Sequence, residues 1–337
     1  MNRRQFHGCL PGCLAAFALG DTMAQAEESP DPTSDPPVNV RAPTLGGKQF
    51  WADELFFHDW HIQRNTFTNH YRLLDGKGFR HAWGTFEQCR TKLDAIRNER
   101  KLPAMSGRAV IVLHGLFRSD NSMKGMAKYL RDEGKFATFN VSYPSTQGEV
   151  ADHAKTLARI LENLHGIDEI HFVGHSLGNL VVRHYLADCT DKANGKCPDS
   201  RIKRMVMLAP PNNGAQLAEV LLTNSVGGTI AGKSGQQIAR DWEKLNQRLA
   251  IPEFEFGIIA GGRNQDRGYN PWLKGDNDAI VSVETARLPG AADFVVVPTI
   301  HTVIMDNADV QQYTLRFLEH GYFVSPEVKQ PIARGAT

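Results

Sequence analysis

The sequence predicts an α/β fold in which helices cover both faces of a mostly parallel β-sheet. From Ala109 onward, short apolar runs rich in β-branched residues alternate with segments of helical periodicity, which is the order of elements that builds a parallel sheet. A chain of 337 residues, 41% of them hydrophobic, can bury the core of one large domain. A serine flanked by glycines joins one apolar run to the next helix, as tight strand-to-helix turns do in such folds.

The first residues have the composition of an export signal. Arg3 and Arg4 precede a short, weakly apolar stretch at residues 9–20, and residues 24–26 are Ala-Gln-Ala, which suits a signal peptidase. Residues 1–26 are therefore predicted to be a twin-arginine-type signal peptide, with the mature chain exported to the periplasm or the extracellular space. Retention as an anchor is the alternative, which the shortness of the stretch disfavours, and no other segment is long and apolar enough to span a bilayer.

A tether and antiparallel strands are predicted to follow. Residues 27–45 are rich in proline, aspartate and serine and hold almost no large apolar side chain, so they cannot form a core. From Phe50 to Leu74, aromatic and polar residues alternate, which predicts a pair of antiparallel strands at one edge. Phe86 to Lys101 has a helical pattern. The main domain is expected to span residues 46–325, and residues 326–337 to be a C-terminal tail.

The main domain is expected to contain six further strands and five further helices. The predicted strands are Ala109–Leu113, Ala137–Ser142, Ile170–Val173, Arg204–Ala209, Phe254–Ile259 and Phe294–Val297. The predicted helices are Met123–Arg131, Val150–Leu164, Leu177–Ala187, Gly235–Arg248 and Asn307–His320. Residues 213–252 have a mixed pattern, which predicts either a small helical lid or cap over the carboxyl edge of the sheet or an ordinary pair of crossover helices.

The cysteines suit an oxidising compartment. Cys9 and Cys13 would leave with the signal peptide, so that Cys89, Cys189 and Cys197 remain. Cys189 and Cys197 bracket a polar loop that a disulfide could close, although two reduced thiols are equally compatible with the spacing. Cys89 is expected to pack on a helix. No spacing of cysteine and histidine predicts a zinc site.

The net charge of the chain argues against nucleic acid as a partner. The formal net charge is +1, and the chain has no long run of lysine or arginine. Nucleic acid is therefore not expected as a partner.

Residues Gly174-His175-Ser176-Leu177-Gly178 predict a nucleophile elbow. An apolar run precedes them and an apolar helical stretch follows, which is the strand-turn-helix context that the pattern requires. Glycines on both sides leave room for the strand and the helix at a turn so sharp that the serine has strained backbone. The Ser176 hydroxyl is therefore expected to project above the sheet. A chance occurrence in a glycine-containing loop is the alternative.

A reactive serine needs a base within hydrogen-bond reach and an acid that fixes the tautomer of that base. Loops that leave the carboxyl ends of the last two strands carry Asp276, Asp278 and His301. His301 is predicted to be the base, because His320, the other histidine after the acidic loop, stands at the end of the final helix. Asp278 is predicted to be the acid because it adjoins an apolar turn, and Asp276 and Glu284 remain alternatives.

The loop after the first strong strand predicts an oxyanion hole. His114-Gly115-Leu116-Phe117 follows that strand, where folds of this kind supply one backbone donor. The amide of Leu116 is expected to be this donor, and the amide of Leu177, the residue after the nucleophile, the second. His114 by itself is expected to be a packed structural residue.

With these motifs the chain resembles secreted bacterial lipases and esterases of the α/β-hydrolase superfamily. The matching pieces are Val112–Leu116, Gly174–Gly178, the turn at Asp278, and His301, and together they span nearly the whole mature chain. The leucine inside the elbow is frequent in triacylglycerol lipases. In such relatives the acid usually precedes a glycine, whereas Ala279 follows Asp278 here.

The resemblance also raises the question of a calcium ion. Some such lipases hold calcium with aspartates near the catalytic histidine, and Asp306 and Asp309 lie near His301. Both are expected to cap the last helix instead. No metal and no cofactor is predicted.

The motifs and the resemblance together predict a serine carboxylic-ester hydrolase, a lipase or an esterase, which acts through an acyl-enzyme on a small-molecule or lipid ester. Apolar residues near the motifs favour an acyl chain, and transient contact with a lipid interface would accompany a mobile lid. An acyltransferase or a thioester or amide hydrolase with the same residues is the alternative. A hydrolase-like binding protein without catalysis is disfavoured by the intact set of partners.

Overall fold

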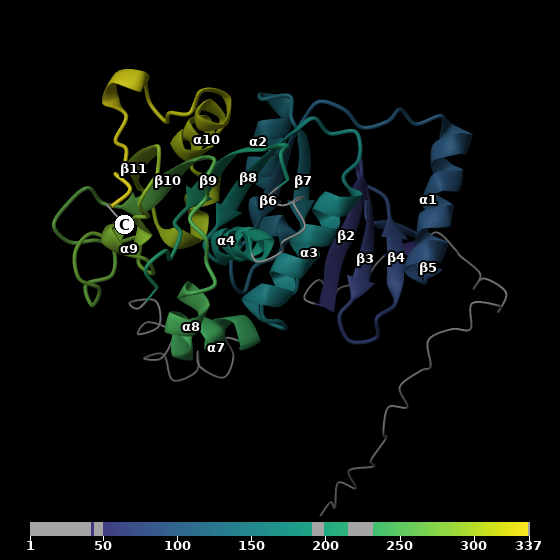
Figure 1. Ribbon diagram of the computed structural model, residues 1–337, viewed down its shortest axis with the longest axis horizontal. Helices are drawn as coiled ribbons and strands as arrows, with labels where there is room; N and C mark the ends of the chain where they lie inside the picture. The colour runs from purple at the N-terminus through teal and green to yellow at the C-terminus, as the bar shows by residue number, and fades with distance from the viewer. Residues whose placement is uncertain (1–41, 44–49, 191–198, 215–231, 336–337) are drawn as a thin grey trace, which may run out of the picture.

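The computed structural model describes residues 42–43, 50–190, 199–214 and 232–335. Within them, a six-stranded parallel sheet has helices on both faces, and a smaller antiparallel sheet lies beside it (Figure 1). The predicted signal peptide (1–26) and most of the predicted tether (27–45) lie outside the described residues. None of the described helices combines the length and the apolar character that a membrane-spanning segment needs.

The six strands predicted for the parallel sheet are confirmed, with ends that shift by no more than three residues. Their spatial order is β11-β10-β9-β8-β6-β7, and every neighbouring pair is parallel. The strands run almost continuously apolar because both faces of the sheet are covered. Their bounds are β6 Arg108–Leu113, β7 Ala137–Val141, β8 Glu169–His175, β9 Ile202–Leu208, β10 Glu255–Gly262 and β11 Asp293–Pro298.

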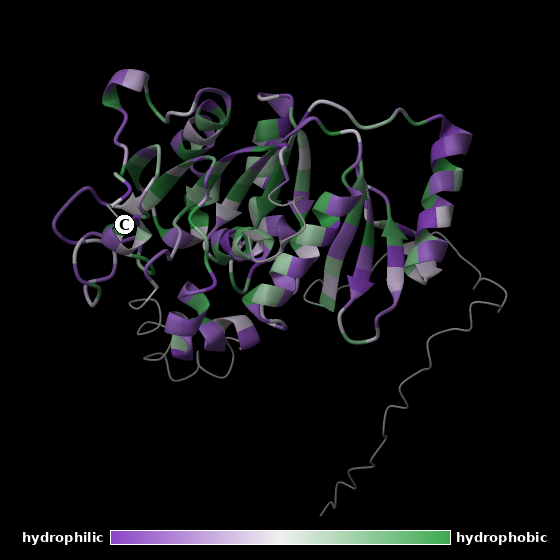
Figure 2. Ribbon diagram, viewed as in Figure 1, coloured by the Kyte–Doolittle hydropathy of each residue, from purple (hydrophilic) through white to green (hydrophobic). Residues whose placement is uncertain are grey.

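Two helices cover each face of this sheet. Helices α2 (Lys124–Asp132) and α10 (Ala308–His320) lie on one face, and α3 (Val150–Asn163) and α4 (Leu177–Thr190) lie on the other (Figure 1). Because successive side chains of a strand point to opposite faces, β6 contributes to both cores. Apolar residues fill the strands and the inner faces of the helices (Figure 2).

The helix predicted at Gly235–Arg248 is wrong as a single element. Two helices occupy the segment, α7 (Gly232–Arg240) and α8 (Trp242–Asn246), because Asp241 between them has non-helical backbone with φ −119° and ψ 27°. The rest of the predicted lid, residues 215–231, lies outside the described residues.

The N-terminal strands differ from the predicted pair at an edge. They form a sheet of their own with the order β1-β5-β4-β3-β2, followed by α1 (Phe86–Arg100). The strand β5 was not predicted, because it is only half-buried and lacks a clear apolar alternation. The turn between β4 and β5 positions β5 for pairing, because the Asp75 carboxylate accepts the amides of Lys77 and Phe79. The bounds are β1 Ala42–Pro43, β2 Trp51–Phe57, β3 Trp60–Asn65, β4 Tyr71–Leu74 and β5 Phe79–Gly84.

A reciprocal pair of hydrogen bonds joins the two sheets. The amide of Asp53 in β2 donates to the carbonyl of Ser142, just after β7, at 2.9 Å. The amide of Ser142 donates to Asp53 Oδ2 at 2.6 Å. Asp53 is fully buried, so its carboxylate connects the two sheets away from solvent.

Two of the remaining cysteines lie in described helices. Cys89 is a buried free thiol on α1, and Cys189 in α4 is disulfide-bonded. Its predicted partner, Cys197, lies outside the described residues.

Candidate functional site

Ser176 stands alone between a strand and a helix. β8 ends at His175 and α4 begins at Leu177, so one residue makes the whole turn. Its φ of 51° lies in the left-handed region, which costs a non-glycine residue energy unless the surroundings hold it there. The amide of Ser176 donates to the carbonyl of Leu208 in β9 at 3.0 Å and holds the turn against the sheet.

The glycines on both sides of Ser176 make this turn sterically allowed. A Cβ on Gly178 would lie 2.7 Å from the carbonyl oxygen of Leu113, so α4 passes against the end of β6 with no room for a side chain. A Cβ on Gly174 would lie 2.4 Å from the side-chain oxygen of Asn179. This sharp turn is therefore possible because Gly174 and Gly178 have no side chain that would collide with their neighbours.

The structure brings Asp278 and His301 together. His301 Nδ1 and Asp278 Oδ2 are 2.7 Å apart, and both side chains are buried. The amide of His301 also donates to the carbonyl of Asp278 at 2.8 Å. Asp278 Oδ1 accepts the amides of Ile280 at 3.0 Å and Val281 at 2.7 Å. With the proton of the imidazole on Nδ1, facing the carboxylate, Nε2 is left as an acceptor.

The other two candidate acids have different partners. Asp276 accepts the amides of Arg263 at 2.7 Å, Asn264 at 2.8 Å and Asn277 at 2.9 Å, and so holds the loop after β10. Glu284 lies on the short helix α9 (Val283–Ala286) and pairs with Arg287 at 3.3 Å. Of the three acids, only Asp278 is hydrogen-bonded to His301.

His175 links the elbow to the histidine loop, which the sequence analysis missed. Its Nε2 and the carbonyl oxygen of His301 are 3.1 Å apart, and the two ring centroids are 4.8 Å apart. Burial holds the pKa of His175 well below its usual value, so the ring is neutral. The hydrogen bonds of the described residues include none between the Ser176 hydroxyl and His301. His175, the residue before Ser176, makes the contacts with His301. The only sequence signal for this role was the place of His175 within the elbow.

The predicted oxyanion loop passes directly over the elbow. A Cβ on Gly115 would lie 2.9 Å from His175 Nδ1 and 3.2 Å from Ser176 Cβ. The next residue, Leu116, is half-buried in a turn. Leu177 is the first residue of α4, and the first N–H groups of a helix have no partner within it. The backbone amides of Leu116 and Leu177 therefore both lie in segments next to Ser176.

Two side chains hold this loop in position. The Tyr143 hydroxyl donates to the carbonyl of His114, and the Arg118 guanidinium donates to the carbonyl of Thr302, next to His301. His114 is buried and stacks on Tyr143, with ring centroids 4.1 Å apart. Burial lowers the pKa of His114 to about 4, as expected for a packed structural histidine.

The aspartates near His301 do not cap the last helix as the sequence analysis expected. The N-cap of α10 is Asn307, whose side-chain oxygen accepts the amides of Asp309 at 2.9 Å and Val310 at 3.2 Å. Asp306 closes the 3-10 helix His301–Asp306, and Asp309 lies in the first turn of α10. In the part of the chain that the structure describes, no group of three or more His, Cys, Asp or Glu residues is arranged to hold a metal ion.

A comparison with known protein families matches part of the chain. The family described as alpha/beta hydrolase fold matches residues 108–254, from β6 to the start of β10. The six-stranded parallel sheet with helices on both faces is consistent with the α/β-hydrolase fold. In this fold the N-terminal antiparallel sheet is an addition before the first matched strand.

Several solved structures are similar to this chain at low identity. A gene product of Listeria innocua is 18% identical with a TM-score of 0.44, over 68% of this chain and 99% of that one. A lipase of Bacillus licheniformis is 17% identical with a TM-score of 0.49, over 70% and 53%. The phospholipase PlaB of Legionella pneumophila is 17% identical with a TM-score of 0.47, over 63% and 60%. At such values the likeness says nothing about substrate. The sequence matches no curated protein.

Proposed function

We propose that the protein is a serine hydrolase of carboxylic esters that acts through an acyl-enzyme. The observation that carries the proposal is the hydrogen bond between His301 Nδ1 and Asp278 Oδ2, next to a serine at a strained strand-to-helix turn. Most proteins with the α/β-hydrolase fold use this combination of residues for hydrolysis.

In the proposed reaction, Ser176 Oγ attacks the carbonyl carbon of the ester while His301 Nε2 takes the hydroxyl proton. Asp278 stabilises the resulting imidazolium without taking a proton itself. His301 then gives the proton to the leaving alcohol, and a water molecule, activated in the same way, releases the acid from Ser176. Hydrogen bonds between Ser and His are often long in free enzymes and tighten with substrate, so the hydroxyl of Ser176 is expected to reach Nε2 in the complex.

The amides of Leu116 and Leu177 are proposed to hold the negative oxygen of the tetrahedral intermediate. Both belong to backbone that lies against Ser176, and the loop with Leu116 is held by Tyr143 and Arg118. Fixed donors of this kind contribute about 3 kcal/mol each to lowering the barrier.

An apolar rim supports an acyl chain as part of the substrate. Phe117, Ile300 and Val303 are 47%, 38% and 44% exposed and flank Leu116 and His301 in sequence. The hydrogen bond from Arg118 to the Thr302 carbonyl brings their two loops side by side. Rates against esters of increasing acyl length, with and without an oil-water interface, would distinguish a lipase from an esterase. A steep rise for long chains at the interface supports a lipase, and a decline beyond short acids supports an esterase.

The experiment that tests the proposal is the Ser176→Ala substitution. Turnover of a chromogenic acyl ester and labelling by a fluorophosphonate probe should both disappear, while the circular dichroism spectrum and the melting temperature remain those of the unchanged protein. An undiminished rate in the variant would show that Ser176 is not the nucleophile. An unchanged protein that neither turns over esters nor takes the probe would be a binding protein, and products formed with a competing alcohol would reveal acyl transfer.

Export through the signal peptide 1–26 is part of the proposal. The disulfide at Cys189 supports it, because disulfides persist mainly in oxidising compartments. Mass spectrometry of the protein from cell fractions should find a chain that begins near Glu27 outside the cytoplasm. A chain that keeps residues 1–26 and stays in the cytoplasmic fraction would exclude export.

A further inference from the structure

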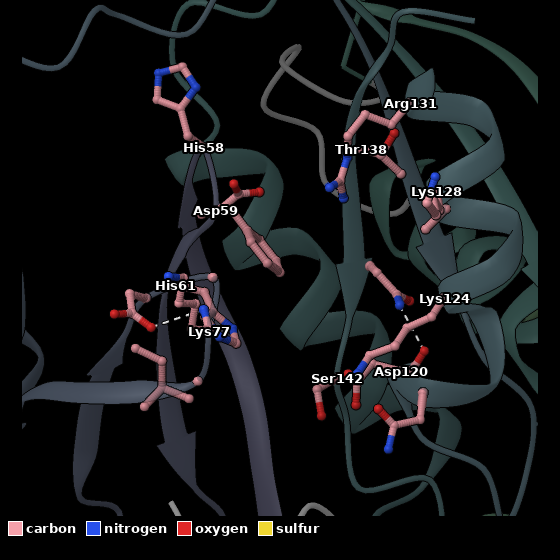
Figure 3. Close-up of a pocket in the computed structure, with 18 of the residues that line it drawn as sticks. His58, Asp59, His61, Lys77, Asp120, Lys124, Lys128, Arg131, Thr138 and Ser142 are labelled. Atoms are coloured by element: carbon pink, nitrogen blue, oxygen red, sulfur yellow. Dashed lines mark hydrogen bonds between the residues drawn. The ribbon is translucent and has the colours of Figure 1, made fainter. Parts of the chain in front are cut away.

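A cleft of about 780 Å³ separates the N-terminal sheet from β7 and α2. It lies outside the proposed active site, since neither Ser176, Asp278 nor His301 lines it. Its volume is within the range of small-molecule sites. Figure 3 shows His61 and Lys77 on one wall and Lys124 and Arg131 on the facing wall.

The cleft opens beside the contacts between β2 and β7, which include the rings of Phe56 and Phe139 with centroids 5.3 Å apart. Ser142, which shares reciprocal hydrogen bonds with Asp53, is one of the residues that line the cleft. Beyond that contact β2 continues toward the turn at His58 and Asp59, which lie on the N-terminal wall, apart from β7 (Figure 3).

A network of buried polar side chains forms the floor. Asp53 Oδ1 accepts Gln63 Nε2 at 2.8 Å and is 2.6 Å from His61 Nδ1. Arg72 donates through Nε at 3.0 Å and Nη2 at 2.7 Å to Gln63 Oε1, and its guanidinium lies 3.8 Å from the centroid of the Trp51 ring. Gln63 and Arg72 are 4% and 9% exposed.

Arg72 carries a buried positive charge with no direct counter-charge. In the described part of the chain no carboxylate forms an ion pair with its guanidinium, while the carboxylate of Asp53 is engaged by Gln63, His61 and the Ser142 amide. Burial lowers the pKa of Arg72 to about 10, so it stays charged at neutral pH. Gln63 and the more distant carboxylate of Asp53 compensate this charge only in part, and an anion in the cleft would add a direct counter-charge.

Both walls add positive charge. On α2, Lys124, Lys128 and Arg131 lie on one helical face that borders the cleft, and Lys77 comes from the turn before β5 on the other side. Asp132 pairs with Lys128, and Asp75 pairs with His81. The whole lining holds five cationic side chains and four carboxylates, so cations are in excess: Arg72, Lys77, Lys124, Lys128 and Arg131 with Asp59, Asp75, Asp120 and Asp132. Clefts with an excess of one sign attract ligands of the opposite sign.

We propose that this cleft binds a small organic phosphate, with Arg72 at the floor and Lys77, Lys124 and Arg131 on the walls facing the phosphate oxygens. A phosphate group carries up to two negative charges and three acceptor oxygens, so cations from three separate elements can surround it. Arginine and lysine are the side chains that bind phosphate oxygens best. The site is separate from the proposed hydrolase chemistry and does not depend on it.

The test is isothermal titration calorimetry of the full-length protein with glycerol 3-phosphate, and a sedimentation assay with vesicles of phosphatidylglycerol or phosphatidylcholine. The variant Lys124→Gln/Arg131→Gln removes two exposed cations of the cleft without touching the buried floor. The control variant Lys92→Gln/Lys155→Gln makes the same change of charge on exposed positions of α1 and α3. Ser176→Ala serves as a second control.

Glycerol 3-phosphate should bind the unchanged protein and both controls with the same affinity, and inorganic phosphate but not glycerol should compete. The cleft variant should bind at least about tenfold more weakly, because each lost hydrogen bond to a charged group is worth about 1.5 kcal/mol or more. Binding to phosphatidylglycerol vesicles alone, lost in the cleft variant only, would identify a lipid headgroup as the source of the phosphate. No binding to either probe, or equal loss in the cleft and control variants, would overturn the proposal.

Discussion

At the scale of single residues, Asp276 and Asp278 show how different surroundings give two identical side chains different roles. Asp276 is surrounded by three backbone amides, whereas Asp278 faces two amides and the imidazole of His301. The first holds a loop, and the second fixes a histidine. Loss of each carboxylate should therefore change a different property.

Asp278→Asn should reduce kcat for an acyl ester by roughly 10³-fold to 10⁴-fold, because an amide at this position favours the wrong tautomer of the histidine. Asp276→Asn should keep kcat within a few-fold and lower the free energy of unfolding by about 1 to 3 kcal/mol, since it leaves a backbone amide without an acceptor. Steady-state kinetics and urea unfolding of both variants measure the two effects. The reverse pattern would assign the triad acid to Asp276.

Buried histidines, among them His114 and His153, should make the protein acid-sensitive. Burial lowers the pKa of His114 to about 4 and that of His153 to about 3, whereas an unfolded histidine has a pKa of about 6.5. Below about pH 6.5 the unfolded chain binds protons that the folded chain does not, so stability is complete above this pH and falls as the pH drops toward 4. Each histidine contributes at most roughly 1.4 kcal/mol per pH unit in this range.

His153→Gln should make this loss of stability less steep. The new side chain cannot titrate and still offers a polar group to Ser234, whose hydroxyl lies 3.0 Å from His153 Nε2. Urea unfolding at pH 7, 6 and 5 should show a slope that is smaller by about 1 kcal/mol per pH unit. His58→Gln, which changes an exposed histidine, should leave the slope as it is. If the free energy of unfolding changed equally with pH in the unchanged protein and both variants, His153 would not be a source of the acid sensitivity.

The sequence alone could propose site residues only where a local pattern suggests their chemistry. Ser176 stands in a strand-turn-helix context, and His301 and Asp278 follow the ends of strands. It did not identify His175, Arg118 or Tyr143, because their contacts join positions far apart in the chain, such as His175 with the carbonyl of His301. A role that comes from such a contact leaves no signal in the neighbouring residues.

At the scale of elements, the end of β6 and the start of α4 are in contact at Gly178, and this contact positions the elbow. Gly178→Ala would place a methyl group 2.7 Å from the Leu113 carbonyl and 3.0 Å from that of His114. Because backbone cannot yield as a side chain can, α4 would have to shift. Ser176 is the residue just before α4, so its hydroxyl would move with the helix.

Gly178→Ala should therefore lower the free energy of unfolding by about 1 to 3 kcal/mol, the usual cost of overpacking, and reduce kcat for an acyl ester at the same time. Denaturant unfolding and kinetics measure both. Gly335→Ala is the matched control, because a Cβ at Gly335 has no neighbour within 4 Å. Full activity and stability in Gly178→Ala would show that the close approach of α4 to β6 is not needed.

The elements that sequence patterns predicted best are those buried on both faces. All six strands of the parallel sheet were predicted, since burial on both sides makes them apolar throughout. The half-buried β5 and the break at Asp241 between α7 and α8 were not predicted, because neither is marked by a periodic pattern of apolar residues in the sequence. The arrangement of the N-terminal strands as a separate sheet depends on contacts with β7 and α3 that no local pattern contains.

At the scale of the whole molecule, Asp53 connects the two sheets. Its buried carboxylate accepts Gln63 and the Ser142 amide and pairs with His61. Asp53→Ala would leave these groups without an acceptor and should lower the free energy of unfolding by about 3 kcal/mol or more. Hydrogen exchange should then increase first at Ser142 and in β2. Asp59→Ala, at an exposed carboxylate nearby, should change neither, and protection that remains intact in Asp53→Ala would exclude this role.

The position of β7 at the end of the parallel sheet has a consequence for solubility. An uncovered edge strand is a template on which other chains add strands, and proteins that leave such an edge open tend to aggregate. β7 pairs with β6 on one side only, and the N-terminal sheet stands beside its other side, anchored after Val141. A chain truncated to the hydrolase sheet would therefore be expected to self-associate through β7 during refolding.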